Sequence, residues 1–192
     1  RLNIPYKVVA GMKFYERKEV KDLLAYIRCV VNDKDSLALS RVINTPVRGI
    51  GARTLRKIED EAIKLKLSLW EVLNLVTDDY DEYKHLKLSA KVRSGLMSFV
   101  TLIHEAKILS EKSEDPTVIY EKLLNESGYL ESLKAEKTYE AQGRIDNLEE
   151  LFTAIKQFQD DAEKATLIGF LETITLDTSV SEGESISEVS MM

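Results

Sequence analysis

The stretch that decides the fold is Leu37–Ile58, LALSRVINTPVRGIGARTLRKI. Its apolar spacing predicts a short helix over residues 37–44. Thr45-Pro46 ends that helix, because the residue before a proline disfavours the α region. Residues 47–51, which include two glycines, predict a tight turn, and an amphipathic helix is expected over residues 52–66. The stretch therefore predicts two helices joined by a turn, here called the Gly-Ile-Gly turn (residues 47–51).

The turn combines accessible backbone with positive charge. Glycines let a ligand approach closely and expose consecutive amides, and the N-terminus of the following helix favours an anion. Arg48, Arg53, Arg56 and Lys57 surround the turn. Such a site suits nucleic-acid phosphates bound without base reading. The pattern resembles the helix-hairpin-helix motif of DNA-binding proteins. The alternative is a plain helix connection with Ile50 as a core plug.

The rest of the central chain is also predicted to be helical. Apolar residues recur at spacings of three and four from Val20 to Ile174, which indicates amphipathic helices rather than strands. The fold class is therefore all-α and bundle-like. Besides those above, helices are predicted over residues 13–31, after a Ser68–Glu71 capping box, through Val92–Ala106, between Asp115-Pro116 and Gly128, and near residues 138–158 and 165–175.

Both ends of the chain differ from this helical block. Residues 4–9 (IPYKVV) and 186–192 (ISEVSMM) predict short extended segments. Residues 177–188 are rich in Ser and Glu without a basic residue, which predicts a linker. The chain also begins at Arg1 rather than Met. We therefore expect this chain to be a piece of a larger protein. In that protein the helical block would be an insertion, and its two extended ends would join the sheet of another domain.

Composition excludes several classes of protein. The 192 residues are 44% hydrophobic and 31% charged, and no apolar run approaches the roughly 20 residues of a membrane span. A single cysteine, Cys29, excludes an internal disulfide, and we expect it to be buried and inert. With only His85 and His104 besides, a Cys/His zinc site is implausible. Neither histidine has an apparent acid or nucleophile partner, so we predict no catalytic and no metal-binding residue.

Nucleotide-binding loops are excluded too. The Walker pattern requires Gly-Lys followed by Ser or Thr, but Ala52 follows Gly51. A dinucleotide fingerprint requires a third glycine where Thr54 stands. We therefore expect no cofactor in this chain and no ATPase activity from it.

Charge is distributed unevenly along the sequence. Residues 1–76 hold 15 Lys and Arg against 9 Asp and Glu, whereas residues 77–192 hold 12 against 24. A polyanion would therefore bind the N-terminal third.

Three blocks resemble the UvrD/PcrA/Rep-type superfamily 1 DNA helicases. Met12–Arg28 resembles the family's G-[ML]-x-F-[FY]-x-R-x-E-[IV]-K-D-x-L-x-Y-L-R segment. Arg41–Gly51 resembles R-[IV]-[IV]-N-x-P-x-R-G-I-G, and Glu140–Leu151 resembles E-[AG]-Q-x-R-[LI]-[ED]-N-[LI]-x-E-[LF]. The blocks occur in the family's order and span nearly the whole chain. Ala10 and Gly143 depart from the usual residues.

The resemblance implies an accessory 2B subdomain of an ATP-dependent 3′→5′ helicase. It implies that the segment Arg48–Thr54 grips duplex DNA ahead of the fork, and that the subdomain rotates between open and closed states. ATP and Mg would serve the parent protein through motifs on both sides of this chain. By position, amides of Gly49, Ile50 and Gly51 and side chains of Arg48, Arg53 and Thr54 would bind phosphate, with added charge from Arg56 and Lys57; Phe14, Tyr15 and Arg17 would lie near the parent domain.

The same resemblance divides the chain and names its partners. Residues 1–12 would join the parent RecA-like domain, residues 13–176 would form the helical subdomain, and residues 177–192 would be the acidic linker returning to the parent. Expected partners are duplex DNA at a single-strand/double-strand junction, other subdomains of the helicase, and accessory repair or replication proteins, in the cytoplasm and without a membrane. The alternative is a protein-interaction or autoinhibitory module without direct DNA contact. The pathway and the accessory proteins stay open.

Overall fold

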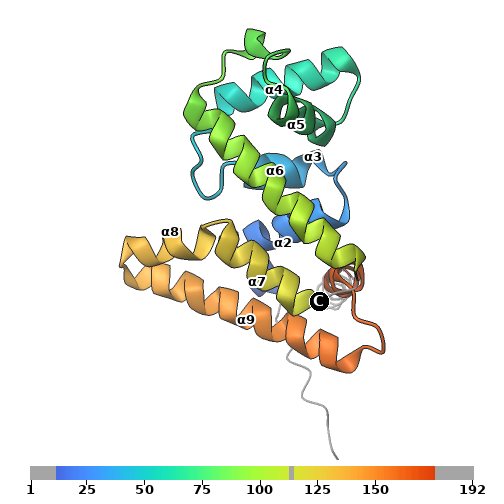
Figure 1. The fold of residues 1–192 in the computed structure, drawn as a ribbon. Helices are drawn as coiled ribbons and strands as arrows, with labels where there is room; N and C mark the ends of the chain where they lie inside the picture. Colours follow the sequence, from blue (N-terminus) through green and yellow to red (C-terminus); the bar gives the residue numbers. More distant parts are fainter. Residues whose placement is uncertain (1–11, 113–114, 176–192) are drawn as a thin grey trace, which may run out of the picture.

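The computed structural model describes residues 12–112 and 115–175, and these contain helices and no strand (Figure 1). The all-α prediction is therefore confirmed. The expected extended ends and the linker lie outside the described residues. The helices are α1 (Met12–Tyr15), α2 (Lys18–Val31), α3 (Ser36–Val42), α4 (Ala52–Leu65), α5 (Leu69–Asp78), the 3-10 turn η1 (Lys84–Leu86), α6 (Ala90–Glu111), α7 (Pro116–Glu126), α8 (Tyr129–Glu136) and α9 (Tyr139–Asp161), and residues 167–175 are also helical.

Helix α6 connects the two ends of the molecule. It has 22 residues and is therefore about 33 Å long. At one end it packs on α5, which lies against α4, and farther along it packs on α2 and α7. Helices α7 and α8 lie along α9 at the other end (Figure 1). Helix α6 therefore joins the α4–α5 pair to the helices packed around α2, α7 and α9, together with α3, which contacts both α2 and α5.

Local sequence signals explain where several helices begin and end. The Ser68 hydroxyl accepts from the Glu71 N–H while the Glu71 carboxylate accepts from the Ser68 N–H, so the predicted capping box is confirmed. Pro116 starts α7 at its first position, although the Asp115 side chain makes no capping hydrogen bond. Gly128, at φ +78°, follows the end of α7. Helix α8 follows at once and was not predicted.

The predicted apolar faces form the core. In α6, Leu96, Phe99 and Ile103 are fully buried, and burying each such side chain contributes about 1.5–3 kcal/mol. Cys29 is buried as expected, and Trp70 is 5% exposed. The periodicity that predicted helices therefore also identified the residues that hold them together.

Two buried carboxylates on α2 join it to distant parts of the chain. The Asp22 carboxylate accepts from Arg41 Nε and from the Tyr129 hydroxyl, each at 2.8 Å. The Glu19 carboxylate accepts from Asn147 Nδ2 at 2.5 Å. A charged group is buried at low cost only when it is hydrogen-bonded, as both are here. The Asp22–Arg41 and Glu19–Asn147 bonds tie together the three blocks of sequence that resemble the helicases. The first block covers α1 and most of α2, the second runs from the end of α3 into the following turn, and the third lies on α9.

Candidate nucleic-acid interface

The connection from α3 to α4 contains the Gly-Ile-Gly turn and lies beside the N-terminal end of α6 (Figure 1). Asn44 shapes this connection, because its Oδ1 accepts from the Arg48 N–H at 2.8 Å and from the Ile50 N–H at 3.0 Å. The Ile50 side chain is 2% exposed and belongs to the core. Ile50 is thus the core plug of the alternative interpretation, and its amide already has an acceptor.

The Arg48 guanidinium is directed into the protein. Its Nη2 donates to the Tyr26 hydroxyl at 2.7 Å and to the Ser127 carbonyl at 3.1 Å. Its Nη1 donates at 3.1–3.3 Å to the carbonyl oxygens of Val42, Ile43 and Pro46. The same group lies over the rings of Tyr26 and Phe99, at 5.9 and 5.5 Å from their centroids. Arg48 therefore fixes the loop to α2, α6 and α7, a role that differs from the expected phosphate contact.

Tyr26 completes this anchor. Its hydroxyl donates to the Thr45 carbonyl at 2.5 Å while it accepts from Arg48. Burial raises the pKa of Tyr26 to about 12, and the Arg48 charge opposes that shift only in part. The phenol is therefore protonated at neutral pH and serves as a fixed donor to the loop backbone.

The two glycines of the turn have different roles. Gly49 has φ +82°, a left-handed conformation that favours glycine, and the Lys91 side chain lies against it. Gly51 has φ −74°, and a Cβ built there meets no atom within 4 Å. In the described part of the chain, no acceptor is hydrogen-bonded to the N–H groups of Gly51, Ala52 or Arg53. Gly49 therefore forms the turn, and Gly51 lies at the start of α4 beside amides that have no acceptor, with no atom packed where its side chain would be.

Of the basic side chains that follow the turn, two are exposed and one is hydrogen-bonded within the protein. Arg53 and Arg56 are exposed on the first turns of α4, which has no acidic residue in its first turn. No carboxylate of the described residues forms an ion pair with either of them. Lys57 differs, because its ammonium donates to the Leu86 carbonyl at 2.8 Å. Thr54 is half-buried in the same helix. The structure thus leaves two arginines beside the open amides.

Sequence reasoning missed two residues that position the turn. Asn44 lies within the second helicase-like block, but no role is predicted for it from the sequence. Gly95 of α6 carries no signal in the sequence, yet a Cβ built there would lie 2.7 Å from the Arg48 carbonyl oxygen. The missing side chain lets α6 touch the loop backbone. Asparagine before a Thr-Pro turn was a readable signal, whereas the contact of Gly95 depends on the tertiary fold.

The histidines form contacts that the sequence did not indicate. His85 Nε2 lies 2.9 Å from the buried Glu61 carboxylate, so the expectation of no acid partner was wrong. Hydrogen bonds from His85 and then Lys64 hold the pKa of Glu61 below its usual value. His104 Nε2 lies 2.6 Å from Asn74 Oδ1. No metal-binding group of three or more His, Cys, Asp or Glu occurs within residues 12–112 and 115–175.

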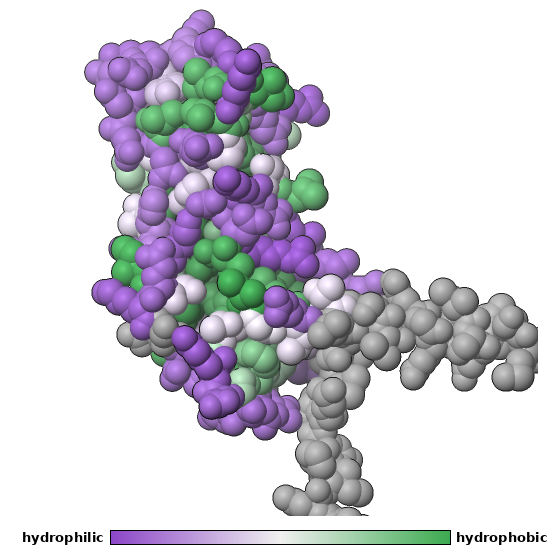
Figure 2. Space-filling model, turned by 90° about the vertical axis from the view of Figure 1, so that its right-hand side faces the viewer, coloured by the Kyte–Doolittle hydropathy of each residue, from purple (hydrophilic) through white to green (hydrophobic). Residues whose placement is uncertain are grey.

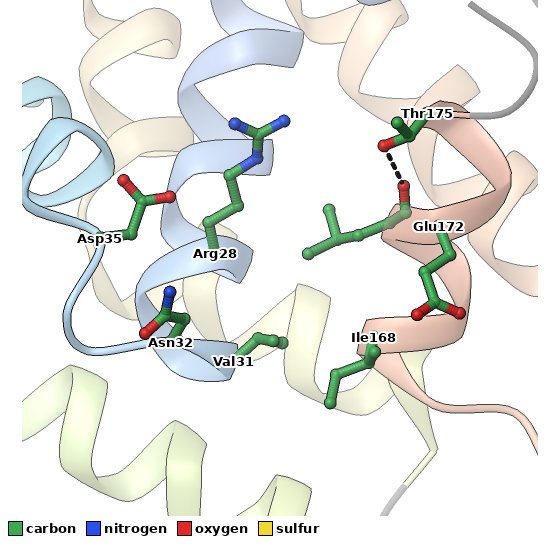
Figure 3. Close-up of a pocket in the computed structure, with 8 residues that line it drawn as sticks. Arg28, Val31, Asn32, Asp35, Ile168, Glu172 and Thr175 are labelled. Atoms are coloured by element: carbon green, nitrogen blue, oxygen red, sulfur yellow. Dashed lines mark hydrogen bonds between the residues drawn. The ribbon is translucent and has the colours of Figure 1, made fainter. Parts of the chain in front are cut away.

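A pocket of about 560 Å³ lies away from the turn, between the end of α2 and the helix at 167–175. Figure 3 shows Arg28 and Val31 on one wall and Ile168 and Glu172 on the other. Apolar areas also alternate with polar ones on the face in Figure 2. Among the exposed apolar side chains is Ile63 of α4, which is 76% exposed.

Comparison with known proteins identifies the family. A family model described as UvrD-like helicase C-terminal domain matches residues 1–192. The chain belongs to this family. Within this UvrD-like domain, the described residues include no helix with the length and apolarity to cross a membrane.

The relatives of this UvrD-like domain are much longer proteins. An ATP-dependent DNA helicase PcrA from Staphylococcus aureus (strain NCTC 8325) is 33% identical over 192 residues. Its counterpart from Staphylococcus epidermidis (strain ATCC 12228) is 34% identical. Each match covers 99% of this chain and 25% of the relative. The domain therefore spans about a quarter of the length of the curated relatives it matches.

Proposed function

We propose that this chain is the 2B-like helical subdomain of an ATP-dependent 3′→5′ DNA helicase. Its Gly-Ile-Gly turn contacts the phosphates of duplex DNA beside a single-strand junction, and this contact regulates unwinding. Membership of the UvrD-like family and the PcrA relatives support the helicase assignment. ATP and Mg act elsewhere in the helicase, since this sequence has no phosphate-binding loop with a lysine.

The observation that carries the DNA contact is the set of backbone amides without an acceptor at the start of α4. The free N–H groups of Gly51, Ala52 and Arg53 lie at the positive end of α4, where the helix dipole favours an anion. The exposed cations Arg53 and Arg56 follow directly. Backbone amides and arginine side chains hydrogen-bond to phosphate oxygens, and such contacts do not depend on the base sequence. The site therefore fits a DNA backbone.

Fewer residues are proposed to contact phosphate than the sequence suggested. Three of the expected residues are used inside the protein: Arg48 and Lys57 donate to protein carbonyls, and the Ile50 N–H donates to Asn44. The proposed ligands are the amides of residues 51–53 and the side chains of Arg53, Thr54 and Arg56. Gly49 forms the turn that presents them.

Duplex binding by this chain is expected to be weak and independent of sequence. Fluorescence anisotropy with two labelled duplexes of unrelated sequence should give similar dissociation constants, on the order of 10⁻⁴–10⁻⁶ M. Two neutralised phosphates should give a log–log salt slope of about −2, and Arg53→Ala should reduce it to about −1. Gly51→Val should weaken binding by blocking close approach. It places no φ > 0 strain on the turn, because Gly51 lies at φ −74°.

Lys156→Ala is the matched control, since Lys156 is an exposed lysine on α9, far along the chain from the turn. It should change neither affinity nor slope. If wild type, Arg53→Ala and Gly51→Val bind alike, or if one duplex sequence is strongly preferred, the turn is not the contact proposed. Unchanged duplex affinity together with altered binding to a helicase subdomain would instead support the protein-interaction alternative.

A further inference from the structure

Lys91 of α6 lies directly on the Gly-Ile-Gly turn. A Cβ built at Gly49 would be 3.4 Å from Lys91 Cε and 3.5 Å from both Cδ and Cγ. The aliphatic part of the lysine therefore covers the Cα of Gly49. Lysine side chains commonly pack their stems on the protein surface and keep the ammonium in water. Lys91 is exposed, in keeping with this arrangement.

Gly95 fixes the distance between Lys91 and the turn. It stands four residues after Lys91, so the two positions share one face of α6. A Cβ at Gly95 would lie 2.7 Å from the Arg48 carbonyl oxygen and 3.0 Å from the Arg48 Cβ. The Arg48 guanidinium holds that segment of backbone from the other side, through Tyr26 and Ser127. The start of α6 is therefore held at contact distance from the loop.

The Lys91 ammonium forms no ion pair within the described residues. No carboxylate of residues 12–112 or 115–175 lies within 4.0 Å of its ammonium, whereas Lys107 on the same helix is paired with Asp33 at 2.7 Å. Arg53 and Arg56 approach the turn from α4, and Lys91 approaches it from α6. Two helices thus bring unpaired cations to one short turn. A ligand with several linked anionic groups could bind all three of these cations at once.

We propose that the first turns of α6 are the second half of the DNA-contact surface. Lys91 binds a phosphate of the duplex whose backbone meets the amides of residues 51–53, and Gly95 is the positioning residue that sets their separation. This inference rests on the proposed function. It raises the number of side-chain phosphate contacts from two to three.

The test is the salt dependence of duplex affinity for this chain and matched variants. Wild type should show a slope of about −3 rather than −2, and Lys91→Ala should reduce it by about 0.9. The affinity of Lys91→Ala should fall several-fold, Lys91→Arg should retain it, and Lys156→Ala should match wild type. Thermal unfolding of Lys91→Ala should be unchanged, since the side chain is exposed.

Two results would overturn the inference, and they can be told apart. If Lys91→Ala behaves as Lys156→Ala while Arg53→Ala and Gly51→Val still weaken binding, the turn contacts DNA without Lys91. If Arg53→Ala and Gly51→Val also bind as wild type, the proposed function itself fails. A loss with Lys91→Ala that Lys91→Arg does not restore would also count against a phosphate contact, because either cation can neutralise a phosphate.

Discussion

Arg48→Ala is expected to lower the free energy of unfolding by about 3 kcal/mol. The substitution removes a guanidinium that donates to four backbone carbonyls and to the Tyr26 hydroxyl. The carbonyls of Ile43, Pro46 and Ser127 would lose their donor in a partly buried site, and their desolvation cost adds to the lost bonds. Urea unfolding followed by circular dichroism would measure the change. Duplex affinity should also fall, because the turn loses its attachment to α2 and α7.

Two variants make this prediction specific to the geometry. Arg48→Lys should recover little stability, because an ammonium cannot replace a planar group that donates in several fixed directions. Arg56→Ala should change stability by less than about 0.5 kcal/mol, since Arg56 is exposed. If Arg48→Ala leaves stability unchanged and reduces only the salt slope of duplex binding, Arg48 is the phosphate contact that the sequence suggested and not the anchor described here.

Gly95→Ala and Gly143→Ala should act in opposite directions although both place alanine inside a helix. At Gly95 the new Cβ would lie 2.7 Å from the Arg48 carbonyl oxygen, a backbone atom that cannot turn away. Overpacking of this kind costs about 1–3 kcal/mol, and only part is offset by the better helix propensity of alanine. At Gly143 nothing lies within 4 Å, so the variant should gain about 0.5–1 kcal/mol. Paired thermal unfolding curves measure both.

Gly95→Ala should also change duplex affinity. Since the loop must move away from α6 to make room, duplex affinity should fall with stability, while Gly143→Ala should bind as wild type. Equal stabilisation by both substitutions would show that α6 and the loop are not in contact at Gly95, and the positioning role given to that residue would be wrong.

The sequence predicted most of the helices because their signals are local. Ser68 and Glu71 form their capping box within one turn, and the apolar spacing in α6 persists from Val92 to Ala106, about four turns. Helix α8 escaped prediction because it has only eight residues and buries only Tyr129 and Leu133. Two apolar positions are too few to establish a period.

The sequence predicted where the candidate site lies, but not which of its residues hold the turn in place and which are open to a ligand. The glycines and cations around the turn are visible in the sequence, so the region itself could be found. The direction of the Arg48 side chain could not be predicted, because it depends on Tyr26 and Ser127, which lie 22 residues before and 79 residues after it. For the same reason the sequence did not separate Gly49, which forms the turn at φ +82°, from Gly51, which precedes α4 at φ −74°.

The most direct test of the central claim is to follow the backbone amides of the ¹⁵N-labelled chain by NMR during titration with duplex DNA. The amide resonances of Gly51, Ala52 and Arg53 should shift most. They should shift alike with two duplexes of unrelated sequence and less at higher salt, because the contact is to phosphate. Large shifts confined to another surface, such as α8 and α9, with the resonances of residues 51–53 unchanged, would contradict the account.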